Sequence, residues 1–340
     1  MIDVAIIGAG PAGSNCAYNL AQKGINASLF DSSHPREKPC GGMLGSSLKE
    51  YFSILENCSI LHSEISSIQI ISPSQVKWAI DISRNKLLGF SRLKFDQYLL
   101  DKAISKGINF ISEKIVNIEK KPSSWKILTQ EHSYMAKFIV GADGVNSLVR
   151  KSLVGPLNKN DLGACFGYNF EGIQTKDLIM KFLPNSAGYI WVVPRGDHTN
   201  IGGGTADISR FRELKRMVST FAKTWYPRLK QISEWAALIP NIKDPKTFST
   251  TAGPNWALIG DAAGHVDPIT GSGISFAMLD GELVADAIYN GNFSQYYKQW
   301  YENYGKDLIL KVRMSELIYK RPMLELYCIY LKLLNSLPII

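Results

Sequence analysis

The chain has 340 residues, 45% of them hydrophobic and 20% charged, which is the composition of an ordinary globular protein long enough for two domains. No apolar run approaches the roughly 20 residues of a membrane-spanning helix and no signal-peptide pattern is present, so we expect a cytoplasmic protein. The net charge of +8 is spread along the chain without a compact cluster of basic and aromatic residues, which argues against a nucleic-acid partner.

The first thirty residues contain a βαβ unit. Residues 3–8 are an apolar, β-branched run typical of a buried parallel strand, and the turn G-x-G-x-x-G follows it directly. Helical spacing then continues to residue 24, and a second strand over 27–30 ends at Asp31. Strand, turn, helix, second strand and terminal acid are all in register, which predicts a site for an adenosine diphosphate group.

The glycines of this turn have separate roles. Gly8 lets the chain turn, Gly10 lets backbone N–H groups approach a pyrophosphate, and Gly13 lets the helix pack close to the strand. The phosphate is expected at the positive helix end, and Asp31 is placed to accept a hydrogen bond from a ribose 2′-hydroxyl. The predicted cofactor-binding residues here are Gly8, Gly10, Pro11, Ala12, Gly13 and Asp31.

A loop with a basic pair, a cysteine and two glycines follows Asp31. Gly41 and Gly42 permit close approach of the backbone to a flat ligand, so Arg36, Cys40 and both glycines are candidates for the cofactor site. The alternative is an ordinary surface turn with a buried cysteine. The five cysteines of the chain are odd in number and never in C-x-x-C spacing, so neither a disulfide framework nor a metal site is predicted.

The next segments alternate between two kinds of structure. Residues 46–55 have helical spacing, and residues 65–90 form short strand-like stretches that we expect to begin a second, antiparallel layer. A helix follows Arg92 and stops at Gly107, and further strands end at residues 141–144 in Gly-Ala-Asp-Gly before another helix. Asp-Gly is also a common turn dipeptide, so Asp143 has a purely structural alternative.

Residues 161–246 read as antiparallel strands with one basic amphipathic helix over 209–233. In the segment 188–194, Tyr189 and Trp191 have strand spacing and therefore face the same side. Two aromatic side chains on one face are either part of the core or the wall of a pocket.

The last third contains another strand that ends in small residues and an acid, Gly260-Asp261, followed by a glycine turn at 271–273 that opens a helix. His265 is a candidate proton donor, and its alternative is a solvent-facing loop residue. Two or three helices rich in Tyr, Lys and Arg follow residue 292. Their last apolar stretch is expected to pack on the protein itself or a partner, with contact to a membrane surface as the competing interpretation.

The G-x-G-x-x-G turn, Arg92 at a helix start and Gly-Ala-Asp-Gly at 141–144 together resemble the flavoprotein family built on the p-hydroxybenzoate hydroxylase fold. The resemblance implies an α/β fold, with a Rossmann-like FAD-binding domain, an inserted antiparallel-sheet substrate domain and C-terminal helices. It also implies that Arg92, Asp143, Gly144, Gly260 and Asp261 bind FAD, and that Gly271, Ser272, Gly273 and Ile274 lie against the flavin ring, where a helix N-terminus stabilises the charge of reduced flavin.

Two further segments narrow the resemblance. Lys38-Pro-Cys-Gly-Gly42 and the pattern Tyr189-x-Trp191-x-x-Pro194 are similar to the geranylgeranyl reductase branch, although Val193 stands where that branch usually has Phe. The branch saturates isoprenoid double bonds, which implies hydride transfer from reduced flavin to a hydrophobic or lipid substrate. Cys40, Tyr189 and Trp191 are then the candidate catalytic, pocket-lining residues, with Tyr168 in the same channel, and NAD(P)H or a reduced carrier is the electron donor.

The alternatives are a flavin-dependent monooxygenase, a halogenase, whose Gly-Trp-x-Trp-x-Ile-Pro resembles residues 188–194, and a protein with a structural flavin. The expected boundaries are 1–64, 91–160 and 247–292 for the FAD-binding domain, 65–90 and 161–246 for the substrate domain, and 293–340 for the C-terminal helices.

Overall fold

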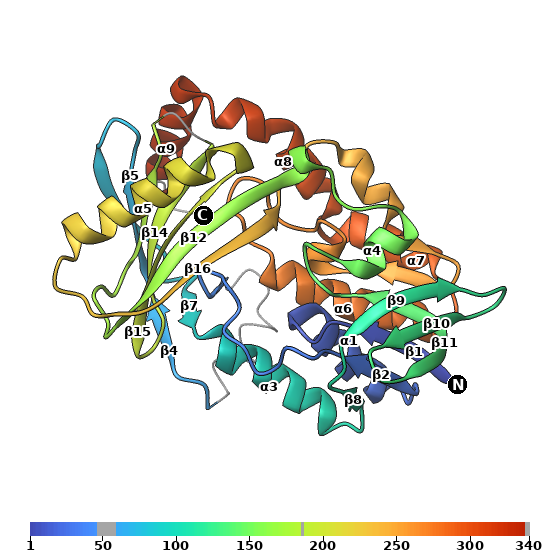
Figure 1. Ribbon diagram of the computed structural model, residues 1–340. Helices are drawn as coiled ribbons and strands as arrows, with labels where there is room; N and C mark the ends of the chain where they lie inside the picture. Colours follow the sequence, from blue (N-terminus) through green and yellow to red (C-terminus); the bar gives the residue numbers. More distant parts are fainter. Residues whose placement is uncertain (46–58, 185–186, 337–340) are drawn as a thin grey trace. The chain divides into compact units, whose positions relative to one another are not determined.

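The computed structural model describes residues 1–45, 59–184 and 187–336 (Figure 1). The helix expected at 46–55 lies outside these residues. The chain forms two compact units, and each contains its own main sheet. The first unit comprises residues 1–36, 93–161 and 240–312, and the second comprises residues 37–92, 162–239 and 313–340.

The first unit is built on an eight-stranded sheet with a parallel centre. Its central strand β1 (Ile2–Ile7) pairs in parallel with a strand on each side, and residues 4–7 are all buried, as a strand covered on both faces requires. The order is β17 (Ala252–Gly253), β18 (Trp256–Leu258), β11 (Ser133–Gly141), β1, β2 (Ala27–Phe30) and β8 (Asn109–Ile111), with β10 (Trp125–Thr129) antiparallel to β11 and β9 (Ile115–Lys120) antiparallel to β10.

Two helices of this unit, α1 (Pro11–Gln22) and α6 (Ile274–Tyr289), pack closely against each other. Asn15 Nδ2 donates to the carbonyl of Met278 at 2.6 Å, and a Cβ added at Gly281 would lie 2.6 Å from the carbonyl oxygen of Ala12. The small residue therefore brings the two helix backbones together. The remaining helices are α3 (Arg92–Ile104), α4 (Leu148–Leu153), α7 (Ser294–Trp300) and α8 (Lys306–Ile318), with a π-helical turn at Tyr301–Gly305 and 3-10 turns at Lys159–Asp161, Pro245–Thr250 and Gly260–Ala262.

The second unit contains a seven-stranded, largely antiparallel sheet. A separate three-stranded sheet pairs β7 (Leu87–Phe90) with β3 (Met43–Gly45) and β4 (His62–Ile65). The antiparallel strands expected in this part of the chain are thus confirmed. The order in the large sheet is β16 (Gln231–Pro240), β12 (Leu162–Glu171), β15 (His198–Thr205), β14 (Gly188–Pro194), β13 (Leu178–Phe182), β5 (Ser67–Ile71) and β6 (Lys77–Asp81).

The two faces of the seven-stranded sheet have different covers. Helix α5 (Phe211–Trp225) lies along one face (Figure 1). There, Leu214 and Val218 pack with Ile190 and Val192 of β14. The predicted extent of this helix to residue 233 was wrong, because it ends at Trp225 and β16 begins at Gln231. Pro227 explains the earlier end, since proline excludes the helical conformation for the residue before it.

Helix α9 (Arg321–Ser336) packs on the opposite face. Its buried Leu324 and Cys328 contact Ile70 and Phe182. The residues that follow Ile70 and Phe182 in the chain pack on the other face of the sheet, with α5. No helix within the described ranges is long and apolar enough to cross a membrane.

Candidate functional site

The turn between β1 and α1 has the geometry of an anion site. Gly8 has φ +101°, and a Cβ there would lie 2.4 Å from the carbonyl oxygen of Ala142. Helix α1 begins without a side-chain cap at Gly10, so its first N–H groups are not satisfied by a side chain. A Cβ at Gly10 would meet nothing within 4 Å, whereas one at Gly13 would lie 1.8 Å from the carbonyl oxygen of Gly8. Gly13 therefore packs the helix against the turn, and Gly10 leaves open space beside donors that suit a phosphate.

Asp31 lies at the carboxyl end of β2, beside this turn. Its carboxylate accepts hydrogen bonds from the N–H of Ala9 at 2.8 Å and from the N–H and hydroxyl of Ser33 at 2.8 and 2.5 Å. Burial raises the pKa of Asp31, but these bonds and the nearby His34 outweigh it and hold the pKa below its usual value. A carboxylate has about four acceptor positions, so the ionised group retains capacity for a ribose hydroxyl.

Asp143 and Gly144 follow β11. The Asp143 carboxylate accepts from the Ser147 hydroxyl at 2.5 Å and from the N–H groups of Leu148 and Val149 at 2.7 and 3.2 Å. Burial raises the pKa of Asp143, and these hydrogen bonds offset part of the rise. Asp143 thus shapes the start of α4, while a Cβ at Gly144 would meet nothing within 4 Å.

Gly260 follows β18 and is held by a buried carboxylate. Its N–H donates to Asp280 of α6 at 2.8 Å, and Asp280 also lies 2.7 Å from Nδ1 of His265 and accepts from the Tyr304 hydroxyl at 2.5 Å. The His265 side chain is fully buried and stacks on Trp300, with ring centroids 4.6 Å apart. The solvent-facing alternative for His265 was therefore wrong, because aromatic rings and a carboxylate enclose this loop residue.

The turn at 267–273 leads into α6. Asp267 Oδ1 accepts from the N–H groups of Ile269 and Thr270 at 2.9 and 3.1 Å, and Lys311 donates to Oδ2 at 2.6 Å. Helix α6 begins at Gly273 without a side-chain cap. A Cβ at Gly273 would lie 3.6 Å from Oδ1 of Asp261, so the predicted acid is beside a second uncapped helix start.

These residues of the first unit follow β1, β2, β11 and β18, at the carboxyl ends of parallel strands, where open α/β sheets bind their ligands. The two uncapped helix starts and the open space at Gly10 and Gly144 fit a dinucleotide such as the expected FAD. The residues that would hold it in this unit are Gly8, Gly10, Pro11, Ala12, Gly13, Asp31, Asp143, Gly144, Gly260, Asp261, Gly271, Ser272, Gly273 and Ile274. Arg36, also in this unit, donates to the Ser33 hydroxyl at 2.7 Å.

The second unit contains Cys40, Gly41, Gly42, Arg92, Tyr189 and Trp191. Gly42 has φ +72°, and a Cβ there would lie 2.4 Å from the carbonyl oxygen of Phe90 and 2.6 Å from Nε of Arg195. Its N–H lies 3.3 Å from the Cys40 sulfur. The glycine therefore lets the cysteine loop pack directly on a guanidinium. Arg92 is buried at the start of α3.

Arg195, at the end of β14, was not singled out in the sequence. Its side chain is fully buried and donates to the carbonyl of Phe90 at 2.6 Å, to Asn169 Oδ1 at 3.3 Å and to the carboxylate of Glu37. Glu37 also accepts from the hydroxyl of Ser91 at 2.8 Å. In the sequence this pair is indicated only by the positions of its members. The acid stands just before the cysteine loop, and the arginine stands just after the Tyr-x-Trp segment.

Tyr189 and Trp191 share one face of β14, as predicted. The Trp191 indole N–H donates to Asn200 Oδ1 at 2.7 Å, and the ring covers Gly202 of the neighbouring strand, where a Cβ would lie 2.6 Å from it. The Tyr189 and Trp191 ring centroids are 5.7 Å apart. This face also carries Trp235, whose ring stacks on Trp191.

Tyr168 lies on the other face, and its predicted place in a channel with Trp191 was wrong. Tyr168 is paired with Ile201 on the neighbouring strand, and Ile201 is paired with Val192 on the strand beyond it. Its side chain therefore points toward α5, like that of Val192, and its hydroxyl forms a hydrogen bond of 2.7 Å with the Ser219 hydroxyl. The face of the sheet on which a strand residue lies depends on the register between paired strands, and the sequence of one strand does not reveal that register.

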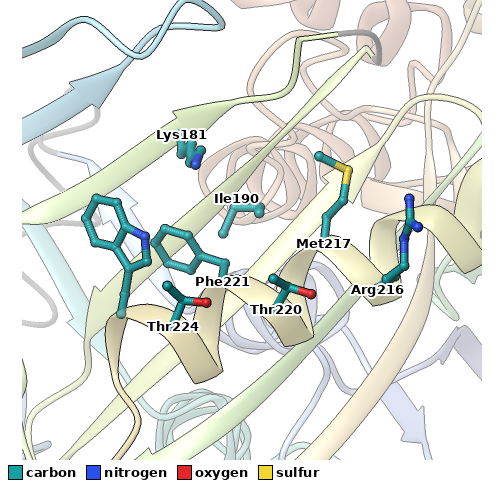
Figure 2. Close-up of a pocket in the computed structure, with 8 residues that line it drawn as sticks. Lys181, Ile190, Arg216, Met217, Thr220, Phe221 and Thr224 are labelled. Carbon is teal, nitrogen blue, oxygen red and sulfur yellow. The ribbon is translucent and has the colours of Figure 1, made fainter.

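A groove of about 440 Å³ lies between α5 and strands β13 and β14, and Figure 2 shows its lining. Burial lowers the pKa of Lys181 in this groove, and the neighbouring Lys77 ammonium lowers it further. The lining residues are Lys181, Ile190, Arg216, Met217, Thr220, Phe221, Thr224 and Trp225.

No protein-family model matches the chain. The chain is 27% identical over 336 residues to a digeranylgeranylglycerophospholipid reductase of Methanococcus vannielii, covering 94% of this chain and 85% of that protein. It is 30% identical over 323 residues to a chloroplastic geranylgeranyl diphosphate reductase of Nicotiana tabacum, covering 85% of this chain and 66% of that protein.

Among solved structures, a geranylgeranyl bacteriochlorophyll reductase-like protein from Thermoplasma acidophilum matches with a TM-score of 0.79 and 22% identity, over 92% of this chain and 86% of that chain. A flavin-dependent brominase matches with a TM-score of 0.71 and 17% identity, over 98% and 93%. These structural matches show the fold, and the predicted flavoprotein α/β architecture is confirmed.

Proposed function

Because the chain belongs to the geranylgeranyl reductase family of FAD-dependent oxidoreductases, we propose that it reduces carbon–carbon double bonds of an isoprenoid lipid. The single observation that carries this proposal is similarity along almost the whole chain to two named isoprenoid reductases. The halogenase and monooxygenase structures share only the fold with this chain, at 17% to 18% identity.

The first unit would hold the cofactor. The uncapped start of α1 would bind the phosphates, and the uncapped start of α6 would face the flavin ring. Asp31 would accept a hydrogen bond from a ribose hydroxyl. When bound, reduced FAD supplies the hydride for the double bond. The Asp267 turn, held by Lys311, would keep the amides that precede α6 in place.

The second unit would supply an apolar wall against which the isoprenoid substrate lies. Tyr189, Trp191 and Trp235 form a continuous aromatic surface on one face of its sheet, and Gly202 lets the Trp191 ring lie flat on the strand. An isoprenoid chain offers no hydrogen-bonding groups, so a fixed apolar surface that excludes water is the recognition it requires.

The proposal is tested with purified protein loaded with FAD and reduced by dithionite without oxygen. Added geranylgeranyl diphosphate or digeranylgeranylglycerophospholipid should reoxidise the flavin and gain two mass units per double bond reduced. The saturated analogue of each lipid is the control and should leave the flavin reduced. A flavin that no isoprenoid reoxidises, or product that contains an added oxygen or halogen atom, would reject the proposed reaction.

The electron donor proposed here is NAD(P)H or a small reduced carrier protein. Support comes from the sequence, which has one G-x-G-x-x-G turn and no second one for a dedicated nicotinamide domain. Anaerobic mixing of oxidised enzyme with NADPH, NADH or a reduced ferredoxin separates the donors by the rate at which flavin absorbance bleaches.

Contact with a membrane surface is proposed for α9. Leu326, Ile329, Tyr330 and Leu333 follow helical spacing on one side of this helix and are each about half exposed, although they are large and apolar. The exposed Lys320 precedes the helix and would meet anionic lipid headgroups. Sedimentation with anionic vesicles should therefore be lost in L326Q/I329Q and kept in V116Q, which changes an exposed valine of the first unit. Equal binding by all three proteins would contradict this contact.

A further inference from the structure

We propose that the ion pair of Glu37 and Arg195 is a positioning device, which holds the Cys40 loop and the Trp191 ring in a fixed arrangement and so sets the shape of the apolar wall. This inference rests on the proposed function, because the wall matters only if an apolar substrate contacts it. Neither Glu37 nor Arg195 is assigned a role in the reaction by the sequence motifs.

Glu37 joins three segments that are far apart in the chain. Its carboxylate accepts from the Arg195 guanidinium, from the Ser91 hydroxyl at 2.8 Å and from the N–H of Arg92 at 3.3 Å. The residue stands three positions before Cys40. Its contacts therefore tie the start of the cysteine loop to the end of β14 and to the residues that follow β7.

Arg195 continues the connection into the sheet. It donates to Asn169 Oδ1, which also accepts from Asn200 Nδ2 at 2.8 Å. Asn200 Oδ1 in turn accepts the indole N–H of Trp191. An unbroken series of hydrogen bonds therefore leads from the loop carboxylate to the aromatic ring. Because the indole has one N–H donor, its bond to Asn200 determines the orientation of the ring.

The loop also packs on the ion pair by contact. A Cβ at Gly41 would lie 3.5 Å from Nε1 of Trp191, and a Cβ at Gly42 would lie 2.6 Å from Nε of Arg195. The loop backbone is therefore in contact with both the indole and the guanidinium. A change at Arg195 would reach Cys40 through Gly42, whose N–H lies 3.3 Å from the thiol sulfur.

Stability alone does not explain a fully buried guanidinium. Buried ion pairs lose about as much by desolvation as they gain by attraction, and well-packed apolar residues often replace them without loss. Arginine instead offers several donors in a rigid plane, which suits a site that must orient several acceptors at once. Here it contacts a carbonyl, an amide oxygen and a carboxylate.

The test compares E37Q, R195K and R195M with E234Q. The last variant removes a surface ion pair of the same unit, in which Lys215 and Glu234 are 47% and 43% exposed. Each FAD-loaded protein is treated with iodoacetamide, and mass spectrometry follows the alkylation of Cys40 and Cys328 separately. Cys328 is the internal control for global unfolding, because burial raises the pKa of its thiol to about 12.

We expect E37Q and R195M to change the alkylation rate of Cys40 by about fivefold or more. The alkylation rate of Cys328 should be unaffected, because only the loop that contains Cys40 opens. R195K should lie between wild type and R195M, since lysine keeps the charge and loses the planar donors. E234Q should match wild type at both cysteines. An unchanged Cys40 rate, or equal acceleration at both cysteines, would overturn the positioning role.

Activity supplies the second readout. With a long and a short isoprenoid lipid, E37Q and R195M should change the ratio of partly to fully saturated product, while bound flavin per protein stays constant. An unchanged ratio despite a loosened loop would also overturn the inference. If wild type reduces no isoprenoid at all, the proposed function fails, and the cysteine rates alone then show whether the ion pair positions the loop.

Discussion

Asp280 lies 2.7 Å from Nδ1 of His265, and both side chains are fully buried in the first unit. The same carboxylate accepts the N–H of Gly260, which follows β18 at the predicted flavin end of the cofactor site. Asp280, in the middle of α6, therefore holds the backbone of a turn that is predicted to bind the cofactor, and His265 contacts the same carboxylate.

Replacing Asp280 tests this support. In D280N the amide NH2 replaces one of the two carboxylate oxygens, so it faces either the N–H of Gly260 or the hydroxyl of Tyr304, and one acceptor for these buried donors is lost. We expect the free energy of unfolding to fall by about 2 to 3 kcal/mol and FAD to bind more weakly. The matched control is D286N on the same helix, which removes an ion pair with Lys23 whose side chains are about a third exposed, and it should cost less than about 1 kcal/mol. Urea unfolding and FAD titration measure both quantities, and equal losses in the two variants would contradict a special role for Asp280.

Two glycines of the β1–α1 turn should separate folding from cofactor binding. A Cβ at Gly10 meets no atom within 4 Å, so G10A should keep the stability of the FAD-free protein within about 1 kcal/mol. The same methyl group fills the space beside the helix start, so FAD affinity should fall by about tenfold or more, or about 1.4 kcal/mol. In G13A the Cβ would lie 1.8 Å from the carbonyl oxygen of Gly8, and the fold itself should lose about 2 kcal/mol or more. Full FAD affinity in G10A would show that the phosphate binds elsewhere.

The pH dependence of stability should reveal Asp31. Its pKa in the folded protein is lowered, so the folded state binds fewer protons at this site than the unfolded chain. The resulting stabilisation is complete above the unfolded value of about 3.9 and is lost as the pH falls through the folded value. Wild type should therefore exceed D31N in stability at neutral pH by an amount that shrinks below about pH 4. Chemical unfolding of the FAD-free proteins across this range provides the measurement, and a constant difference would contradict the lowered pKa.

Lys181 should be an unusually reactive lysine. Burial, and secondly the neighbouring Lys77, lower its pKa, so a larger fraction is neutral at any pH below the ordinary lysine value of about 10.4. Acetic anhydride should modify Lys181 faster than the exposed Lys223 of α5, as peptide mass spectrometry can follow. The variant K77M removes one positive charge, raises the pKa of Lys181 and should slow its reaction. Acceleration in K77M would show that shielding by Lys77, rather than charge, controls the site.

The parts of this fold that could be predicted are those with local causes. The apolar run of β1, the glycine turn and the helix start follow one another in the chain, so their geometry depends on neighbouring residues. The same holds for Tyr189 and Trp191, because alternate residues of one strand always share a face. The end of α5 could also have been predicted, since Pro227 is visible in the sequence and disfavours the helical conformation for the residue before it.

Tyr168 and His265 show where local patterns stop. The face of Tyr168 depends on the register between β12 and β15, and a shift by one residue would place it beside Trp191. The burial of His265 depends on Asp280, Trp300 and Tyr304, which approach it only when α6 and the following helices pack. No pattern within the strand of Tyr168 or the loop of His265 indicates either outcome.

The sequence by itself determined the fold class, the glycine turn after β1 and the family, because each motif that indicates them consists of residues that are neighbours in the chain. Only the tertiary structure decided which distant side chains meet. Glu37 and Arg195 are 158 positions apart, and their contact exists because the sheet of the second unit places the end of β14 beside the cysteine loop. A buried charge is stable only with its partner in place, so this pairing is a property of the packed unit and not of either segment.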